Sequence, residues 1–182
     1  VLQGGFGANG DTWQWDGTTW TSQPSTLGTV NFPELAYDVR RQRVVLYSGG
    51  AINEWDGATW TAVPSAIVPP ARNQLALAYD TARGEVVLFG GRDAGGSTEG
   101  RTWVWNGTIW AERTALAAPP RRTNHVMAFD SRRGVVVAFG GYDETFQLRD
   151  TTLEWDGATW SERVMATAVP VPRFDAAMGF DE

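Results

Sequence analysis

Three arginines recur at one position of a repeated sequence pattern. Each lies seven residues before an aromatic residue, and the pairs are Arg72 with Tyr79, Arg122 with Phe129, and Arg173 with Phe180. A guanidinium group donates forked hydrogen bonds to a carboxylate or phosphate, so these arginines are candidate binding residues. The alternative is structural, in which each arginine bonds neighbouring carbonyls and ties adjacent repeats together. The pattern favours the structural alternative and leaves binding open.

Two long polar segments carry further candidates for binding. Residues 92–101 are rich in glycine and are expected to be mobile, whereas residues 142–150 offer two aromatic rings and three carboxylates. Loops on a rigid scaffold commonly hold recognition surfaces, and aromatic and arginine side chains make good anchors. The alternative is that both segments are solvated loops without a ligand. The candidate side chains are Arg92, Asp93, Tyr142, Asp143 and Phe146.

The inventory of metal ligands and nucleophiles is small. The chain has one histidine, His125, and no cysteine. This predicts no transition-metal site, no disulfide and no thiol chemistry. A Ser-His-Asp triad would need His125, and the G-x-S-x-G motif of many hydrolases is missing, so a structural histidine is the simpler interpretation. We therefore expect no metal, no cofactor and no enzymatic activity.

The charge of the chain argues against two classes of partner. Its net charge is −6 and it contains no lysine, so it lacks the basic stripe typical of proteins that bind nucleic acid. No apolar segment is long enough to cross a bilayer as a helix, so membrane insertion is not expected. The missing lysine, with abundant arginine and alanine, indicates GC-rich coding and a bacterial source. The location stays open, with a secreted or cell-surface one favoured.

The elements that must position these candidates repeat along the chain. A Trp-Asp/Asn-Gly-x-x-Trp motif occurs four times, at residues 15–20, 55–60, 105–110 and 155–160. Before each motif lies a short β-branched segment that ends in a glycine pair. The apolar patterns are short, alternating or continuous, which predicts strands, and no segment has a convincing helical period. The Asp-Gly and Asn-Gly dipeptides predict tight type I′ hairpins.

Each repeat is therefore expected to be a four-stranded antiparallel meander with strands a, b, c and d. The last repeat has only a strand a, whereas the first has only strands b, c and d, so the two chain ends are expected to complete one unit together. The whole chain, residues 1–182, is interpreted as a single all-β domain. The predicted units are residues 30–62, 72–112, 122–163, and 173–182 combined with 1–22.

A hydrophobic strand that ends in Gly-Gly and precedes an aromatic hairpin resembles the kelch repeat. The resemblance covers essentially the whole chain and implies a β-propeller of the type in the central domain of galactose oxidase, with each unit as one blade. The split unit is similar to propeller closures in which one blade combines both chain ends. Rings of this family usually have six or seven blades, whereas this chain has four units. The copper chemistry of galactose oxidase is not implied, because its His and Cys ligands have no counterparts here.

The fold carries many functions and is a weak signal for activity. From the loop-face residues we expect a non-enzymatic module that binds a protein or glycan on the face formed by the b–c loops and d–a links. One alternative is a structural or assembly module, either an oligomeric propeller or part of a larger kelch-repeat protein. Another is a hydrolase that uses carboxylates on the loop face. Because four blades would have to be unusually wide to close a ring, a homodimer that closes an eight-bladed ring is favoured. A four-bladed ring and a fragment of a longer propeller remain open.

Overall fold

The structure is a computed structural model that describes residues 1–4, 10–114, 119–164 and 169–181. Within these ranges all regular structure is β-strand, arranged in five antiparallel sheets, and no helix is present. Accordingly, none of the described residues belongs to a helix that could span a membrane. The predicted all-β class is confirmed.

Three of the sheets have four strands each, joined in sequence as meanders. The second sheet contains β4 (Glu34–Asp38), β5 (Arg43–Ser48), β6 (Ala51–Trp55) and β7 (Trp60–Ala62). The third sheet contains β9 (Ala76–Asp80), β10 (Glu85–Phe89), β12 (Thr102–Trp105) and β13 (Trp110–Arg113). The fourth sheet contains β14 (Val126–Asp130), β15 (Val135–Phe139), β16 (Thr152–Trp155) and β17 (Trp160–Arg163).

The two remaining sheets are smaller. The N-terminal sheet has three strands, β1 (Leu2–Gln3), β2 (Thr12–Trp15) and β3 (Trp20–Gln23). A two-stranded ribbon pairs β8 (Arg72–Asn73) with β11 (Arg92–Asp93), which the sequence analysis did not foresee. Residues 5–9 of the predicted N-terminal unit, including Gly5 of its glycine pair, lie outside the described residues.

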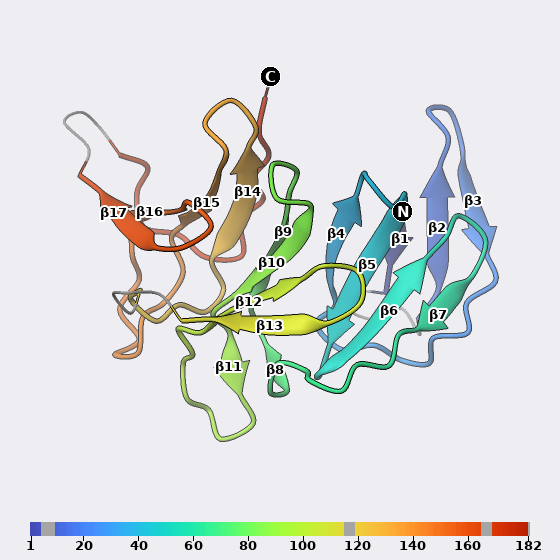
Figure 1. Ribbon diagram of the computed structural model, residues 1–182, viewed down its shortest axis with the longest axis horizontal. Coiled ribbons are helices and arrows are strands. Elements are labelled where there is room, and N and C mark those ends of the chain that lie inside the picture. The colour runs from blue at the N-terminus through green and yellow to red at the C-terminus, as the bar shows by residue number, and fades with distance from the viewer. Residues whose placement is uncertain (5–9, 115–118, 165–168, 182) are drawn as a thin grey trace.

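The four larger sheets follow one another across the molecule in chain order, from the N-terminal sheet to β14–β17 (Figure 1). The first strands of the complete sheets are neighbours, because β4 lies beside β9 and β9 lies beside β14. We call these three the inner strands. Among the described residues the sheets form no closed ring, and the two ends of the chain lie apart.

The C-terminal segment, residues 173–181, was predicted to complete one unit with the N-terminal strands, within one chain or between two chains. Within the described part of this chain its residues form no strand and pair with no strand of the N-terminal sheet, and Glu182 lies outside the described part. Pairing between two chains stays a prediction. Two backbone hydrogen bonds hold the segment against the fourth sheet instead. Gly141 N–H donates to the Arg173 carbonyl at 2.8 Å, and Asp175 N–H donates to the Asn124 carbonyl at 3.2 Å.

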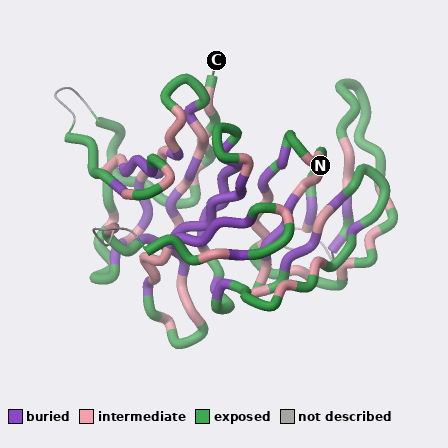
Figure 2. The backbone as a smooth tube through the Cα atoms, viewed as in Figure 1, coloured by how far each residue is buried: buried purple, intermediate pink, exposed green. Residues whose placement is uncertain are grey.

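The hydrophobic core lies between neighbouring sheets. Tyr47 and Ile52 of the second sheet pack with Tyr79, Leu88 and Trp105 of the third. A second cluster joins the third and fourth sheets in the same way. In Figure 2 the buried backbone accordingly concentrates in the complete sheets, and the hairpins extend outward as exposed turns. In the three complete sheets, the tryptophans of the repeated motif are therefore core residues that bury large apolar areas.

The hairpin turns differ from the predicted type I′ geometry. Each strand pair closes at its two tryptophans, such as Trp105 with Trp110, so four residues form the loop. Only the glycine of each loop has a positive φ, for example 95° at Gly107. The side chain before it closes the turn, since Asn106 Oδ1 accepts the backbone N–H groups of Thr108 and Ile109. Aspartate makes the same bonds elsewhere, which explains why the repeats accept either residue.

Candidate functional site

The repeated arginines lie where the sequence pattern indicated, but two of them are deeply buried. Arg72 is 4% exposed and donates to the carbonyls of Pro70 and Gly90. Arg122 is 3% exposed and donates to the Arg121 carbonyl and the Thr151 hydroxyl. Burial lowers the pKa of both guanidinium groups. These contacts match the structural alternative.

Arg173 differs from the other two because it is exposed. Its Nε donates to the Val171 carbonyl at 3.2 Å. The carbonyl of Arg173 accepts from Gly141, as the carbonyl of Arg122 accepts from Gly91, both at 2.8 Å. The backbone of this position thus makes the same contact in consecutive repeats, while the side chain is free to face solvent.

The two long loops have the same backbone design. Asp93 N–H donates to the Ser97 carbonyl at 3.1 Å, and Asp143 N–H donates to the Gln147 carbonyl at 3.0 Å. In the first loop Glu99 N–H donates to the Gly91 carbonyl, and in the second loop Arg149 N–H donates to the Gly141 carbonyl. The first loop also pairs with β8 through β11. Both loops are thus hydrogen-bonded ribbons, and the pairing explains how a Gly-rich loop holds a definite shape.

Asp93 and Asp143 organise these loops. Asp93 Oδ1 accepts the Ser97 N–H, and Asp143 accepts the N–H groups of Thr145 and Gln147 and a salt bridge from Arg149. Burial acts to raise the pKa of Asp143, but the bonds from Gln147, Thr145 and Arg149 outweigh it and hold the pKa well below its ordinary value. The acceptor capacity of Asp143 is therefore largely used inside its own loop.

Phe146 occupies an unusual backbone position. It has φ of 58°, in the left-handed region, whereas the first loop has Gly96 there with φ of 84°. A bulky residue in this region is strained by roughly 1–3 kcal/mol, and such strain clusters at ligand sites. The ring is 54% exposed, and the Arg92 guanidinium carbon lies 4.9 Å from its centroid. Two predicted site residues from different loops thus form one cation–π pair.

A pocket opens beside this pair on the loop face. It has a volume of about 260 Å³, and we call it the loop-face pocket. Tyr142 and Phe174 form one wall, with ring centroids 5.0 Å apart. The pocket combines aromatic rings, one guanidinium group, two amides, two hydroxyls and a carboxylate. Its lining residues are Gln74, Arg92, Thr123, Asn124, Tyr142, Phe146, Phe174 and Asp175.

The structure therefore brings together Arg92, Tyr142 and Phe146 from the predicted set. Arg72, Arg122 and Arg173 do not line the loop-face pocket, and neither do Asp93 and Asp143. Sequence reasoning missed Gln74, Asn124 and Asp175, which occupy one position in three successive repeats. All three have a positive φ, which Asn and Asp tolerate well but which no pattern marks for Gln. Asn124 Nδ2 also donates to Asp175 Oδ1 at 2.7 Å.

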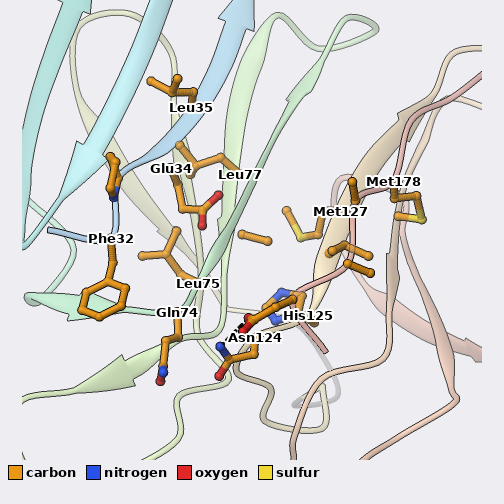
Figure 3. A pocket seen from close by; sticks show the side chains of 16 residues that line it. Phe32, Glu34, Leu35, Gln74, Leu75, Leu77, Asn124, His125, Met127 and Met178 are labelled. Carbon is orange, nitrogen blue, oxygen red and sulfur yellow. Dashed lines mark hydrogen bonds between the residues drawn. The ribbon is translucent and has the colours of Figure 1, made fainter. Parts of the chain in front are cut away.

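A larger cavity, of about 580 Å³, lies deeper along the inner strands (Figure 3). It shares Gln74, Asn124 and Asp175 with the loop-face pocket, so these residues line both spaces. Glu34 lines it among apolar side chains. Burial, aided by the charge of Asp175, raises the pKa of Glu34 to about 7.

His125 also borders this cavity but is built into the boundary between sheets. Its ring meets Phe89 edge to face at a centroid distance of 5.2 Å. It is 5% exposed, and neither ring nitrogen has a hydrogen-bond partner within the described chain. Burial, with a smaller effect from Arg122, lowers its pKa to about 3. His125 is thus a neutral residue packed at the boundary between two sheets.

Across the described ranges, no cluster of three or more His, Cys, Asp or Glu side chains could hold a metal ion. The carboxylates of the two long loops are mostly engaged by arginines or backbone N–H groups. The loop face offers aromatic surfaces for stacking and polar groups for hydrogen bonds.

The class of protein that the fold defines is an all-β protein with several antiparallel sheets, for which a propeller-like arrangement is plausible. No protein-family model and no curated protein matches the chain. Solved structures do match, including one described as the structure of YjhT. It is 18% identical, with a TM-score of 0.63, and the alignment covers 76% of this chain and 52% of that one. The chain thus spans about half the length of that structure, and the likeness concerns the fold alone.

Proposed function

We propose that this chain is a kelch-type β-propeller module, non-enzymatic, that recognises a glycan or protein through the loop-face pocket. The fold-level support is the sequence repeat together with the match to the YjhT structure. The observation that carries the function is Phe146. Its half-exposed ring stacks with Arg92 although its backbone is in a strained, left-handed conformation. The first loop has a glycine, Gly96, at the equivalent position, and a glycine adopts this conformation without strain.

The chemistry of the pocket suits a sugar better than an extended peptide. Aromatic faces accept the apolar C–H surface of a sugar ring, and amide and carboxylate groups satisfy its hydroxyls. Phe146 and the Tyr142–Phe174 pair supply the faces, and Asn124 and Asp175 supply the polar groups. The volume of about 260 Å³ limits the site to a small unit such as one terminal residue of a glycan.

The hydrolase alternative finds less support. It depended on carboxylates of the loop face, and Asp143 is bound by Arg149 and by backbone N–H groups of its own loop. Asp93 likewise bonds its own loop through Ser97. A carboxylate engaged in this way is poorly placed to exchange a proton with a substrate.

The test is binding of the purified chain to a printed array of oligosaccharides, compared with the variant Phe146→Gly. Glycine matches Gly96 of the first loop and removes the strain, so the variant should fold at least as stably while losing the ring. We expect at least a ten-fold loss of binding for Phe146→Gly and for Arg92→Gln.

The matched control is Ile109→Gly, which removes an exposed side chain from the hairpin turn of the third sheet. Binding should survive this change. Oligosaccharides that bind the parent chain and Phe146→Gly equally would contradict the site, and an array with no ligand above background would contradict a glycan as the ligand.

A further inference from the structure

The N-terminal sheet has a hydrophobic face that the rest of the described chain leaves uncovered. Trp15 and Trp20 are each 50% exposed, and Leu2 on the same face is 46% exposed. The corresponding tryptophan pairs of the three complete sheets are at most 7% exposed. Their ring geometry is nearly the same, with centroids 5.5 Å apart in the N-terminal sheet and 5.6 Å in the others. The N-terminal sheet therefore presents a standard core face to solvent.

In the complete sheets, the preceding sheet covers this face through both apolar and polar contacts. The Trp105–Trp110 pair packs on the second sheet, and the Trp155–Trp160 pair packs on the third. The second tryptophan can donate to a threonine of the preceding sheet, as Trp60 does to Thr12 and Trp160 to Thr102, both at 2.8 Å.

The first tryptophan can donate to a glutamate of the preceding sheet. Trp105 Nε1 lies 3.0 Å from Glu54 Oε1, and Arg41 holds the Glu54 carboxylate. Threonine and glutamate at these two positions can therefore accept hydrogen bonds from the tryptophans of the next sheet.

The fourth sheet carries the matching acceptors on its outer face. Thr152 is equivalent to Thr102 because each lies three residues before the first tryptophan of its motif, and Glu154 is equivalent to Glu54. Arg133 holds Glu154 as Arg41 holds Glu54, and Arg163 binds the second carboxylate oxygen of Glu154. Within the described part of the chain, the Thr152 hydroxyl and the Trp20 indole have no hydrogen-bond partner.

The apolar part of this face is also incomplete. Val137 and Phe139 are only partly buried, whereas the equivalent Val87 and Phe89 of the third sheet are fully buried. The following sheet makes this difference, because Val87 and Phe89 pack against the fourth sheet. Val137 and Phe139 have no following sheet in the described chain.

The C-terminal segment occupies the place of a next inner strand. Asp175 N–H donates to the Asn124 carbonyl, just as Asn124 N–H donates to the Gln74 carbonyl one repeat earlier. Gly141 N–H likewise donates to the Arg173 carbonyl, just as Gly91 N–H donates to the Arg122 carbonyl. The N-terminal sheet has the complementary deficiency, because β1 pairs with β2 on one side and with no strand of the described chain on the other. An unpaired strand edge readily accepts another chain.

We propose that two copies of this chain join head to tail through these surfaces. The N-terminal face (Leu2, Trp15, Trp20) of one copy packs on the C-terminal face (Val137, Phe139, Thr152, Glu154) of the other. Trp20 Nε1 donates to the Thr152 hydroxyl and Trp15 Nε1 to the Glu154 carboxylate. The segment 173–181 of the second copy then lies along the free edge of β1.

A second copy of the chain is the partner that fits these surfaces best. Each chain carries both surfaces of the repeated sheet-to-sheet contact, one on its N-terminal sheet and the other on its fourth sheet. Head-to-tail contacts close into a ring when the rotation allows, and two copies related by a two-fold axis would bury both pairs of faces.

The test begins with the mass of the 182-residue chain by size-exclusion chromatography with light scattering. We expect twice the chain mass of 19.9 kDa. Trp20→Arg should reduce the mass to that of one chain, and so should Val137→Arg on the other face. Ile109→Arg, which adds the same charge to an exposed hairpin turn, should leave the dimer intact. Circular dichroism confirms that each variant is folded.

Mixing the two interface variants gives the sharper result. Trp20→Arg retains a working C-terminal face and Val137→Arg a working N-terminal face, so the mixture should recover a species of two chains, while neither variant does so alone. A parent chain that stays at 19.9 kDa at every concentration reached would overturn the proposal. A dimer that survives both substitutions would overturn it as well, because another surface would then hold the copies.

Discussion

The indole Nε1 of Trp160 donates a 2.8 Å hydrogen bond to the hydroxyl of Thr102, across the boundary between the third and fourth sheets. Trp160 is 7% exposed and Thr102 1% exposed, so water cannot easily replace either partner. The second tryptophan of the repeated motif therefore both fills the core and fixes how one sheet sits on the next.

We expect Thr102→Val to destabilise the protein by about 1–3 kcal/mol. Valine keeps the shape of the side chain but removes the acceptor, which leaves a buried indole N–H without a partner. Urea unfolding followed by circular dichroism measures the change. Thr108→Val, on an exposed hairpin turn, is the control and should shift the free energy of unfolding by less than about 0.5 kcal/mol. Equal effects at the two sites would mean that the bond contributes little.

Gly90→Ala should be far more damaging than Gly49→Ala, although both glycines open a Gly-Gly pair. Both have a positive φ, 67° and 57°, so alanine strains each backbone by about 1 kcal/mol. At Gly90 a Cβ would also lie 2.4 Å from the Arg122 carbonyl oxygen, whereas at Gly49 no atom lies within 4 Å. We expect a difference of at least about 3 kcal/mol, or loss of soluble protein for Gly90→Ala alone. Similar thermal midpoints for the two variants would refute the close approach.

His125→Leu should stabilise the protein, by about 1 kcal/mol at neutral pH. The ring nitrogens are buried and find no partner among the described residues, and the preceding repeat has Leu75 at this position, 3% exposed. Because the pKa of His125 is lowered to about 3, the unfolded chain binds a proton that the folded chain does not once the pH falls below 6.5. The advantage of leucine should therefore grow by about 1 kcal/mol between pH 7.5 and pH 5.5. Urea unfolding at both pH values decides this, with Leu75→His expected to show the opposite trend.

Glu34→Gln should stabilise the protein above pH 7 and have little effect below pH 4.5. The pKa of Glu34 is raised to about 7 from 4.5, so the folded chain holds this proton more tightly than the unfolded chain. Its contribution to stability is full below pH 4.5 and is lost as the pH rises through 7. At pH 8 the gain on substitution should be about 1–3 kcal/mol, reduced from the full linkage value because the side chain is partly exposed.

Thermal midpoints of the parent and Glu34→Gln across this pH range provide the measurement. Glu112→Gln, which removes an exposed carboxylate, is the control for the change in net charge. A pH-independent difference between the parent and Glu34→Gln would show that the pKa of Glu34 is the same in the folded and unfolded chains, which contradicts the raised pKa.

The sequence by itself was enough for the strands of the three complete sheets. The run Val135–Phe139 is β-branched and apolar, and it forms β15 with those bounds. Short-range pattern decides such elements, because alternation and side-chain shape act over a few residues. The predicted type of hairpin turn was wrong. The Asp-Gly and Asn-Gly dipeptides suggested a two-residue turn, but the Asp or Asn side chain accepts backbone N–H groups and stabilises a four-residue loop instead.

The candidate site was only partly predictable. Arg92 and Phe146 are more than fifty residues apart, and only the packing of the third sheet on the fourth brings them within 4.9 Å. Arg72 and Arg122 looked equivalent to Arg173 in the sequence, yet the first two are buried and the third is exposed. Burial depends on which sheet covers a residue, and that is a property of the assembled molecule.

The C-terminal segment likewise has local features that the sequence determines and a position that only the tertiary packing decides. Its sequence pattern matched an inner strand, and its backbone contacts with the fourth sheet are those of the preceding repeat. Whether it also pairs with β1 depended on how far the sheets turn from one to the next. Local sequence determines which residues can form a strand, but only the cumulative packing angle between sheets decides which strands meet.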